Sequence, residues 1–300
     1  MKEELMAIIE IGSNNTKTHI YDGNDVVYDH LATIEFKKNY KLEGKILESD
    51  LDSLYKEIET ALSYTNNVNI YGCSIFRNIT TEELNEINNT LEDKFNLTIT
   101  VVSQEEEAEY TALGAYGNID YDGNICIFIG GGGSTELIIV NNKKIIDKKY
   151  LDFGVVDITN HFPDLKEDIA TVPFDEAYLY VDSLIGEFKP QCDIMILSGG
   201  NHPYWYKNAE FELLENNLYK SENQPSMLTI EMSDKYDHEA LKISLDKVRS
   251  NSDNPPWFDG SRAMKIITNV ISHRINAKYI IPTNINMEDG IRNKLLNKED

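Results

Sequence analysis

The chain has 300 residues, of which 41% are hydrophobic, with 17 Tyr and 10 Phe among them. This length is too great for one small core and indicates two domains. The 51 acidic residues outnumber the 28 basic ones and give a formal net charge of −23 at pH 7. Because like charges repel, this balance argues against nucleic acids and anionic membrane surfaces as partners.

The apolar stretches, the N-terminal sequence and the cysteines bear on where the protein is located. No stretch approaches eighteen consecutive apolar residues, and the start, Met1-Lys2-Glu3-Glu4, lacks the layout of a signal peptide. Cys73, Cys126 and Cys192 are odd in number and widely spaced, which fits neither a disulfide framework nor a zinc motif. We therefore expect a cytoplasmic protein without a membrane span.

Apolar patterning predicts an α/β arrangement from the start of the chain. Strands are expected over residues 5–11, 17–21 and 26–34, because turn residues separate the last two. A helix is expected over 49–64, where apolar residues recur at helical spacing and Ser49 is a candidate N-cap. A strand over 68–72, a helix from Thr80 or Thr81 to 95, a strand over 97–102 and a helix over 105–116 follow.

After residue 117 the same succession of predicted elements begins again. A strand is expected over 124–129, followed by a glycine loop and a hairpin made of 136–140 and 143–151. Further on, helices are expected over 155–162, 174–187, 233–250 and 261–275 and after Asp289, with strands over 194–197 and 279–281. A strand, a glycine loop and a hairpin thus occur in succession twice, which indicates a duplicated α/β fold.

Three glycine-containing loops follow predicted strands. The first contains Gly12, and a tight glycine turn lets backbone N–H groups approach a phosphate, although a plain hairpin explains the same residues. The second has four consecutive glycines, 130–133, more than a plain turn needs, which favours close approach to a ligand. It is not a P-loop, because no Gly-Lys-Ser/Thr follows. The third, Gly199-Gly200, fits either a ligand loop or a strand-to-helix turn.

Charged residues stand between the first two loops. Acids in the first turn of a helix usually complement the helix dipole, which accounts for Glu105 and Glu106. A carboxylate near a phosphate also orients or deprotonates an attacking water, so this stretch of acids has a possible chemical role as well. Arg77 follows a strand end, where a guanidinium can grip a phosphate with two parallel hydrogen bonds.

Five pieces in this order resemble the Ppx/GppA family of exopolyphosphatases and guanosine pentaphosphate phosphohydrolases: Glu10–Asn15, Gly72–Arg77, Ser103–Glu109, Ile129–Glu136 and Ser198–Gly200. Phe153–Val156 and Met287–Arg292 extend the similarity towards the C-terminus. The resemblance implies two actin-like (ribonuclease H-like) α/β domains facing an interdomain cleft. We place them at residues 1–121 and 122–300, with added helices in the second.

The resemblance also implies roles for individual residues. Glu107 matches the family's catalytic glutamate, and Arg77 its phosphate-binding arginine. Glu10 and Glu136 are the expected carboxylates of a Mg²⁺ site. The expected phosphate-binding residues come from all three loops: Gly12, Ser13, Asn14, Gly131, Gly132, Gly133, Ser134, Thr135, Gly199 and Gly200.

The chain departs from the family pattern at several of these positions. Glu10 replaces an aspartate, Ile129 stands where the second loop has its aspartate, and Glu109 stands where the family has arginine. An isoleucine cannot bind a metal ion. The departures therefore bear directly on metal binding and on catalysis.

The function expected from the resemblance is hydrolysis of the terminal phosphoanhydride of inorganic polyphosphate or of pppGpp, with Mg²⁺ as cofactor. Two alternatives stay open. One is an inactive sensor that binds polyphosphate or guanosine penta- or tetraphosphate, and the other is an actin-like ATP-dependent kinase. The sequence does not choose between polyphosphate and pppGpp, nor does it decide whether the chain forms a homodimer.

Overall fold

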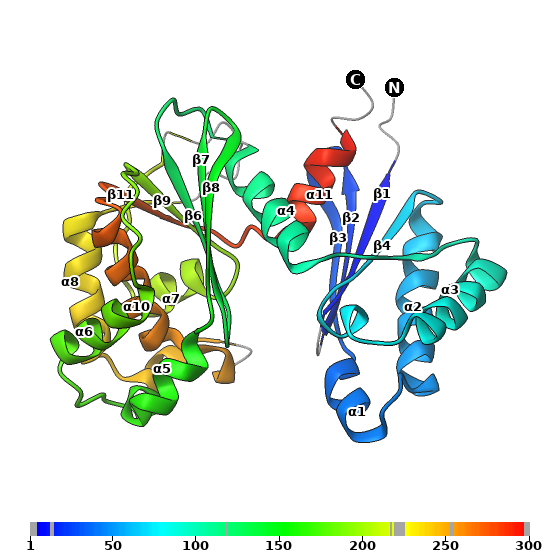
Figure 1. The fold of residues 1–300 in the computed structure, drawn as a ribbon, viewed down its shortest axis with the longest axis horizontal. Helices are drawn as coiled ribbons and strands as arrows, with labels where there is room; N and C mark the ends of the chain where they lie inside the picture. The colour runs from blue at the N-terminus through cyan, green and yellow to red at the C-terminus, as the bar shows by residue number, and fades with distance from the viewer. Residues whose placement is uncertain are drawn as a thin grey trace. The chain divides into compact units, whose positions relative to one another are not determined.

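The structure is a computed structural model that describes residues 5–12, 15–117, 119–216, 218, 226–252 and 255–296. The chain divides into two compact units, the first formed by Met1–Glu107 with Ile291–Asp300 and the second by Ala108–Gly290. Each unit contains one β-sheet with helices packed on it (Figure 1), which confirms the α/β prediction. Among the helices of the described residues, none is both long and apolar enough to cross a membrane.

The sheet of the first unit has the order β3-β2-β1-β4-β5. Strands β1, β2 and β3 are joined antiparallel, whereas β4 pairs parallel with β1 and β5 parallel with β4. The strands are β1 (Met6–Ile11), β2 (Asn15–Asp22), β3 (Asp25–Thr33), β4 (Val68–Gly72) and β5 (Ile99–Val101).

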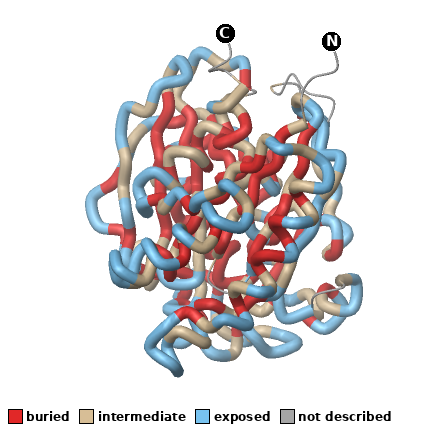
Figure 2. Tube along the Cα trace, turned by 90° about the vertical axis from the view of Figure 1, so that its right-hand side faces the viewer, coloured by how far each residue is buried: buried red, intermediate tan, exposed pale blue. Residues whose placement is uncertain are grey.

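Helices cover one face of this sheet. Ile9 and Ile11 of β1 share a buried cluster with Leu54 and Ile58 of α2 and Leu91 of α3. Figure 2 shows buried residues along the strands and exposed residues on the outer sides of helices. The helical segments of this part are α1 (Phe36–Glu43), α2 (Glu48–Tyr64), the 3₁₀ turn η1 (Ser74–Arg77), α3 (Thr81–Phe95) and the beginning of α4 (Gln104–Gly117).

The second sheet repeats the first topology. Its order is β10-β11-β9-β6-β7-β8, so that β8, β7 and β6 form the antiparallel trio and β9 and β11 the parallel pair. The strands are β6 (Ile125–Gly130), β7 (Thr135–Asn141), β8 (Lys144–Leu151), β9 (Ile194–Ser198), β10 (Leu228–Thr229) and β11 (Tyr279–Pro282). The duplication predicted from the sequence is therefore confirmed by strand order and direction.

Both faces of the second sheet are buried. On one face Ala108 and Ala112 of α4 share a cluster with Ile127 and Ile138. The other face carries the largest cluster, to which α5, α6, α8 and α10 contribute. The remaining segments are α5 (Val155–His161), η2 (Pro163–Lys166), α6 (Phe174–Ile185), α7 (His202–Asn208), α8 (Ile230–Ala240), α9 (Leu245–Ser250), η3 (Pro255–Phe258), α10 (Ser261–Arg274) and α11 (Met287–Leu296).

Two local predictions were wrong. Ser49 is not an N-cap, because α2 begins at Glu48 and its N-cap residue is Leu47. The single helix expected over 233–250 is two helices, since α8 ends at Ala240 and the Ser244 side chain caps α9 by accepting from the Lys247 amide. Helices α1 and α7 were not predicted.

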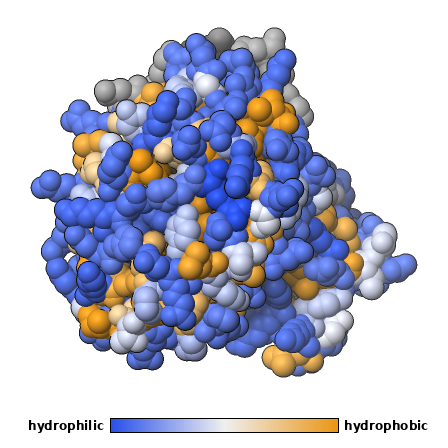
Figure 3. All heavy atoms as spheres, turned by 60° about the vertical axis from the view of Figure 1, so that its left-hand side comes forward, coloured by the Kyte–Doolittle hydropathy of each residue, from blue (hydrophilic) through white to orange (hydrophobic). Residues whose placement is uncertain are grey.

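The surface and the cysteines agree with the composition. The face shown in Figure 3 is mostly hydrophilic, with scattered hydrophobic areas. Cys73, Cys126 and Cys192 are free thiols, and all three are buried.

Candidate active site

The first loop lies between β1 and β2. The Gly12 amide donates to the Asn15 carbonyl oxygen at 2.9 Å, which closes the turn. A Cβ at Gly12 would lie 3.0 Å from that same oxygen, so a larger residue would crowd it. Ser13 and Asn14, both predicted to bind phosphate, lie outside the described residues.

An acid and a base face each other across this loop. Glu10 in β1 and Lys17 in β2 are directly opposite in the antiparallel register. Lys17 Nζ lies 2.7 Å from Glu10 Oε2, and the side chains are 31% and 13% exposed. The carboxylate predicted to bind metal is therefore neutralised by an ammonium group. Sequence reasoning passed over Lys17, and the signal that could have found it is its position opposite Glu10 in the hairpin.

The two residues expected to act on the reacting phosphate lie together in the first unit. Arg77 ends η1, directly after β4, and Glu107 lies in the first turn of α4. Arg77 Nη1 donates to Glu107 Oε2 at 2.7 Å and to the Val102 carbonyl oxygen at 3.0 Å. The side chains of the ion pair are 28% and 37% exposed, so both groups are open to solvent and to a ligand.

Glu106 has a structural role, as the sequence predicted. Its carboxylate accepts from the Ser103 amide at 2.9 Å and from the Ser103 hydroxyl at 2.8 Å, and the Glu106 amide donates back to that hydroxyl. This reciprocal arrangement is a capping box at the start of α4. The hydrogen bond from the Ser103 amide is the main reason that the pKa of Glu106 is lowered.

The second glycine loop joins β6 to β7. The Gly131 amide donates to the Ser134 carbonyl at 2.9 Å, and the carbonyls of Gly131 and Gly132 accept from Val155 and Val156 at the start of α5. Among the described residues, no hydrogen bond uses the amides of Gly132 and Gly133, and both glycines are exposed. These two N–H groups are the ones available to an anion.

The side chains after the glycines mostly support the loop. The Thr135 hydroxyl is buried and donates to the Phe153 carbonyl at 3.0 Å. The Ser134 hydroxyl donates to Glu136 Oε1 at 2.8 Å. Glu136 is directly opposite Ile129 in the β6–β7 register. The apolar side chain of Ile129 therefore occupies the position next to the Glu136 carboxylate.

The third loop is a turn that only glycine fits well. Gly199 and Gly200 have φ of +71° and +62°, in the left-handed region. A Cβ on Gly199 would lie 2.8 Å from Asn286 Oδ1. The Ser198 hydroxyl donates to the Ile285 carbonyl at 2.8 Å, which ties the loop to the segment before α11.

A buried polar group lies behind the third loop, and sequence reasoning missed it. Lys265 of α10 and Asp237 of α8 are both 1% exposed, and Lys265 Nζ lies 4.0 Å from the centre of the Tyr206 ring. Burial lowers the pKa of Lys265 to about 8 and raises that of Asp237 to about 6. Burial, followed by the charge of Lys265, holds the pKa of His202 well below its usual range.

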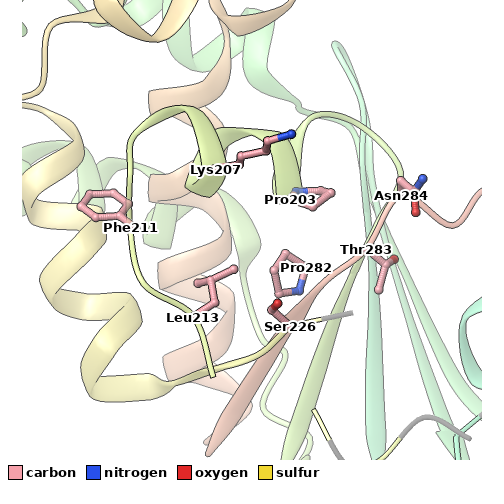
Figure 4. Close-up of a pocket in the computed structure, with 8 residues that line it drawn as sticks. All are labelled: Pro203, Lys207, Phe211, Leu213, Ser226, Pro282, Thr283 and Asn284. Atoms are coloured by element: carbon pink, nitrogen blue, oxygen red, sulfur yellow. The ribbon is translucent and has the colours of Figure 1, made fainter. Parts of the chain in front are cut away.

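The second unit also contains a pocket of about 470 Å³ between α7 and the end of β11 (Figure 4). None of the predicted site residues lines it. It begins at the helix that follows the third loop, and its wall combines apolar rings with one ammonium group. The lining residues are Pro203, Lys207, Phe211, Leu213, Ser226, Pro282, Thr283 and Asn284.

The predicted Mg²⁺ site requires acidic side chains close together. Across the described ranges, no three His, Cys, Asp or Glu side chains gather in a way that could hold a metal ion. Glu10 is bound to Lys17, and Glu136 accepts from Ser134 beside Ile129. Mg²⁺ requires hard anionic oxygens in a near-octahedral shell. Neither unit by itself offers such a set, and magnesium binding stays a prediction.

The repeated strand order, three antiparallel strands followed by two parallel ones, with a glycine loop inside each first hairpin, defines an actin-like, ribonuclease H-like α/β protein. The sequence model of the Ppx/GppA phosphatase family matches residues 34–195, more than half of the chain. The chain therefore belongs to the Ppx/GppA phosphatase family. Membership indicates a hydrolase of phosphoanhydrides.

Solved structures agree with this fold. The Aquifex aeolicus member of the Ppx/GppA family is 18% identical, with 99% of each chain covered and a TM-score of 0.77. The type II crystal structure of the Aquifex aeolicus Ppx/GppA phosphatase is 15% identical, with 97% of this chain and 99% of the other covered and a TM-score of 0.81. An exopolyphosphatase from Cytophaga hutchinsonii is 18% identical, with 98% of each chain covered and a TM-score of 0.63. No curated protein sequence matches the chain.

Proposed function

We propose that the chain hydrolyses the terminal phosphoanhydride bond of inorganic polyphosphate or of pppGpp. A water oxygen attacks the terminal phosphorus, the bond from that phosphorus to the bridging oxygen breaks, and inorganic phosphate leaves. The bridging oxygen stays with the shortened chain. The observation that carries the proposal is the contact between Arg77 and Glu107.

This contact suggests how the two groups act on a substrate. The guanidinium of Arg77 holds the Glu107 carboxylate at 2.7 Å. An incoming phosphate is a stronger partner for the planar guanidinium, because two parallel hydrogen bonds form. As Arg77 turns to the phosphate, the Glu107 carboxylate becomes available to accept a hydrogen bond from the attacking water and orient it.

The glycine loop of the second unit, taken by itself, offers neutral donors to an anion. The amides of Gly132 and Gly133, which are exposed in the described chain, suit phosphate oxygens. Backbone donors cost no reorganisation when charge develops, because the loop is already held by Val155 and Val156. For a chain of net charge −23, such local donors are needed to attract a polyanion at all.

The test is phosphate release from polyphosphate and from pppGpp by the wild type and Glu107→Gln. Loss of the carboxylate is expected to lower kcat by about 10²- to 10⁴-fold. Glu82→Gln is the matched control, since Glu82 is an exposed first-turn acid of α3 in the same unit. Full activity of a folded Glu107→Gln protein would remove the assigned role.

A second candidate is a sensor that binds the same ligands without turnover. Ile129 favours it, since this side chain replaces a carboxylate next to Glu136. Tight binding of polyphosphate or guanosine penta- or tetraphosphate by the folded wild type, with no phosphate released, would support the sensor. Turnover of either substrate would eliminate it.

A further inference from the structure

The carbonyl groups of the second glycine loop are held by the turn that begins α5. The Val155 amide donates to the Gly131 carbonyl oxygen at 3.1 Å, and the Val156 amide donates to the Gly132 carbonyl oxygen at 2.8 Å. Both amides belong to the first turn of the helix, where N–H groups have no partner inside the helix. The start of α5 therefore uses its own unsatisfied donors to hold the loop.

Holding a carbonyl group fixes the direction of the next N–H group along the chain. The Gly131 carbonyl and the Gly132 N–H belong to one peptide unit, and the Gly132 carbonyl and the Gly133 N–H belong to the next. A peptide unit is planar and trans, so its C=O and N–H bonds point in opposite directions. Because both carbonyls are bound to α5, the N–H groups of Gly132 and Gly133 point away from this helix.

The same hydrogen bonds strengthen these two donors. An N–H group donates better when the carbonyl of its own peptide unit accepts a hydrogen bond, because hydrogen bonds in a chain polarise one another. Among the described residues, no hydrogen bond uses the N–H groups of Gly132 and Gly133, and both glycines are exposed. Two successive donors that point away from the same support suit an oxyanion.

Gly154 allows the close approach of α5 to the loop because it has no side chain. A Cβ at this position would lie 2.6 Å from the Gly132 carbonyl oxygen, and it would also overlap the Gly131 carbonyl oxygen. Both obstacles are backbone atoms, which cannot turn aside as the end of a flexible side chain can. The φ of Gly154 is −149°, an extended value that other residues also adopt. The need for glycine therefore comes from the contact with the loop.

The turn that contains Gly154 is itself held from two directions. The Gly154 amide donates to Asp157 Oδ2 at 2.9 Å, which satisfies a further N–H group at the start of α5. On the side of α10, the N-cap residue Gly260 leaves room for Val155, since a Cβ on Gly260 would lie 3.1 Å from Val155 Cγ2. The support of the loop is thus fixed by contacts within α5 and by packing against α10.

We propose that residues 154–156 are the positioning turn of the phosphate-binding loop: they direct the N–H groups of Gly132 and Gly133 at a phosphate oxygen, and Gly154 must be glycine for this contact to form. The inference rests on the proposed function, because the phosphate is that of the proposed substrate. Without the positioning turn, the two peptide units are free to rotate, and a carbonyl oxygen that faces the anion repels it. The positioning turn acts through the loop and does not touch the substrate.

The first test removes one hydrogen bond of the positioning turn and keeps the helix. Val155 is the first residue of α5, a position that tolerates proline. Val155→Pro removes the N–H that holds the Gly131 carbonyl, whereas Val155→Ala keeps this N–H and loses only methyl groups. Calorimetric titration with inorganic tripolyphosphate is made in the presence of Mg²⁺ and in the Glu107→Gln background, so that the ligand is not consumed.

Val155→Pro should bind tripolyphosphate about tenfold to hundredfold more weakly than Val155→Ala, the loss that corresponds to one hydrogen bond to a charged group. The reason is that the Gly132 N–H is no longer directed by its own peptide unit. Circular dichroism checks that both variants are folded. Equal affinities of the two folded variants overturn the proposal.

Gly154→Ala tests the close approach directly. It should bind tripolyphosphate about tenfold to hundredfold more weakly than the wild type, because the new Cβ displaces the loop carbonyls. Ser244→Ala is the control: it removes the side-chain cap of α9 in the same unit without touching the loop, and it should bind as the wild type does. Wild-type affinity in a folded Gly154→Ala protein, or equal weakening in the two variants, overturns the proposal.

The amides themselves give a measurement that a purely structural role would not change. The chain has 17 glycines, so ¹⁵N-glycine labelling gives a small set of amide signals, and Gly132→Ala and Gly133→Ala identify the two of interest. Tripolyphosphate should shift both signals in the protein with an intact positioning turn, and the Gly132 shift should be lost in Val155→Pro. Binding that leaves both signals unmoved overturns the proposal, as does the absence of any binding.

Failure of the proposed function is recognised separately. If tripolyphosphate shifts the Gly132 and Gly133 signals and Val155→Pro abolishes the Gly132 shift, the positioning turn is supported even where the wild type releases no phosphate from any substrate. In that case the proposed hydrolysis fails, and the loop binds phosphate without turnover.

Discussion

Arg77 Nη1 lies 2.7 Å from Glu107 Oε2, although thirty positions separate the two residues in the chain. One residue ends the turn after a parallel strand, and the other opens a helix after the next strand. Parallel neighbours bring their carboxyl ends to one edge of the sheet, which places both side chains there.

From the contact between Arg77 and Glu107 we expect that replacing Arg77 lowers the rate of hydrolysis strongly but changes the free energy of unfolding little. Arg77→Ala should lower kcat/KM for phosphate release by about 10²- to 10³-fold, because a preorganised cationic donor is removed. Arg77→Lys should recover only part of it, since an ammonium cannot form the two-pronged contact. The free energy of unfolding should change by no more than about 1 kcal/mol, as the pair is partly exposed. Unchanged kcat/KM in Arg77→Ala would contradict the role.

The third loop predicts a backbone effect. Gly199→Ala should lower the free energy of unfolding by about 1–3 kcal/mol, because φ is +71° and the new Cβ meets Asn286 Oδ1 at 2.8 Å. Gly133→Ala is the comparison: no atom lies within 4 Å of its Cβ position. Urea unfolding monitored by circular dichroism measures both. Equal losses in the two variants would refute the strained-turn explanation.

Two buried charged residues of the second unit, Lys265 and Asp237, predict a pH-dependent penalty. Lys265→Met should lower the free energy of unfolding at pH 7 by about 0.5–3 kcal/mol, since the buried Asp237 carboxylate loses the influence of a nearby positive charge. Burial raises the pKa of Asp237 from 3.8 to about 6. The contribution of the Asp237 side chain to stability is therefore fully present below about pH 3.8, and it is lost as the pH rises through about 6 and the carboxyl group ionises. The penalty in Lys265→Met should accordingly be smaller at pH 5 than at pH 7.

The control for this penalty is the double variant Asp237→Leu/Lys265→Met, which removes both charges. It should be more stable than Lys265→Met, because the cost of burying the Asp237 charge is removed together with the charge of Lys265. Thermal melts at pH 5 and pH 7 give the comparison. A double variant as unstable as Lys265→Met would show that packing, and not charge, causes the loss.

Helix capping gives a prediction that separates two residues with similar sequence signals. The Thr80 side chain accepts from the Glu83 amide at 3.1 Å, so Thr80→Ala should cost about 0.5–2 kcal/mol of stability. Ser49→Ala should cost almost nothing, because Ser49 lies within α2 and does not cap it. Denaturant midpoints of the two variants check this, and a larger loss in Ser49→Ala would reverse the assignment.

Helix boundaries show where local patterns stop being sufficient. The apolar spacing over 233–250 continues through the break, so the sequence predicted one helix, but Ser244 starts a new one. A serine that caps a helix and one inside a helix have the same local sequence signal, as Ser49 shows. Which of them caps depends on where packing against the core ends the preceding turn.

The sequence alone determined the two-sheet α/β fold, since apolar runs bounded by glycine and turn residues are local signals and they occur twice. It also determined the order of the glycine loops and the capping role of Glu106. Only the tertiary structure decided that Arg77 meets Glu107 and that Glu10 is bound to Lys17. The partner of a charged side chain depends on strand register and on which strands become neighbours, and residue periodicity does not specify either.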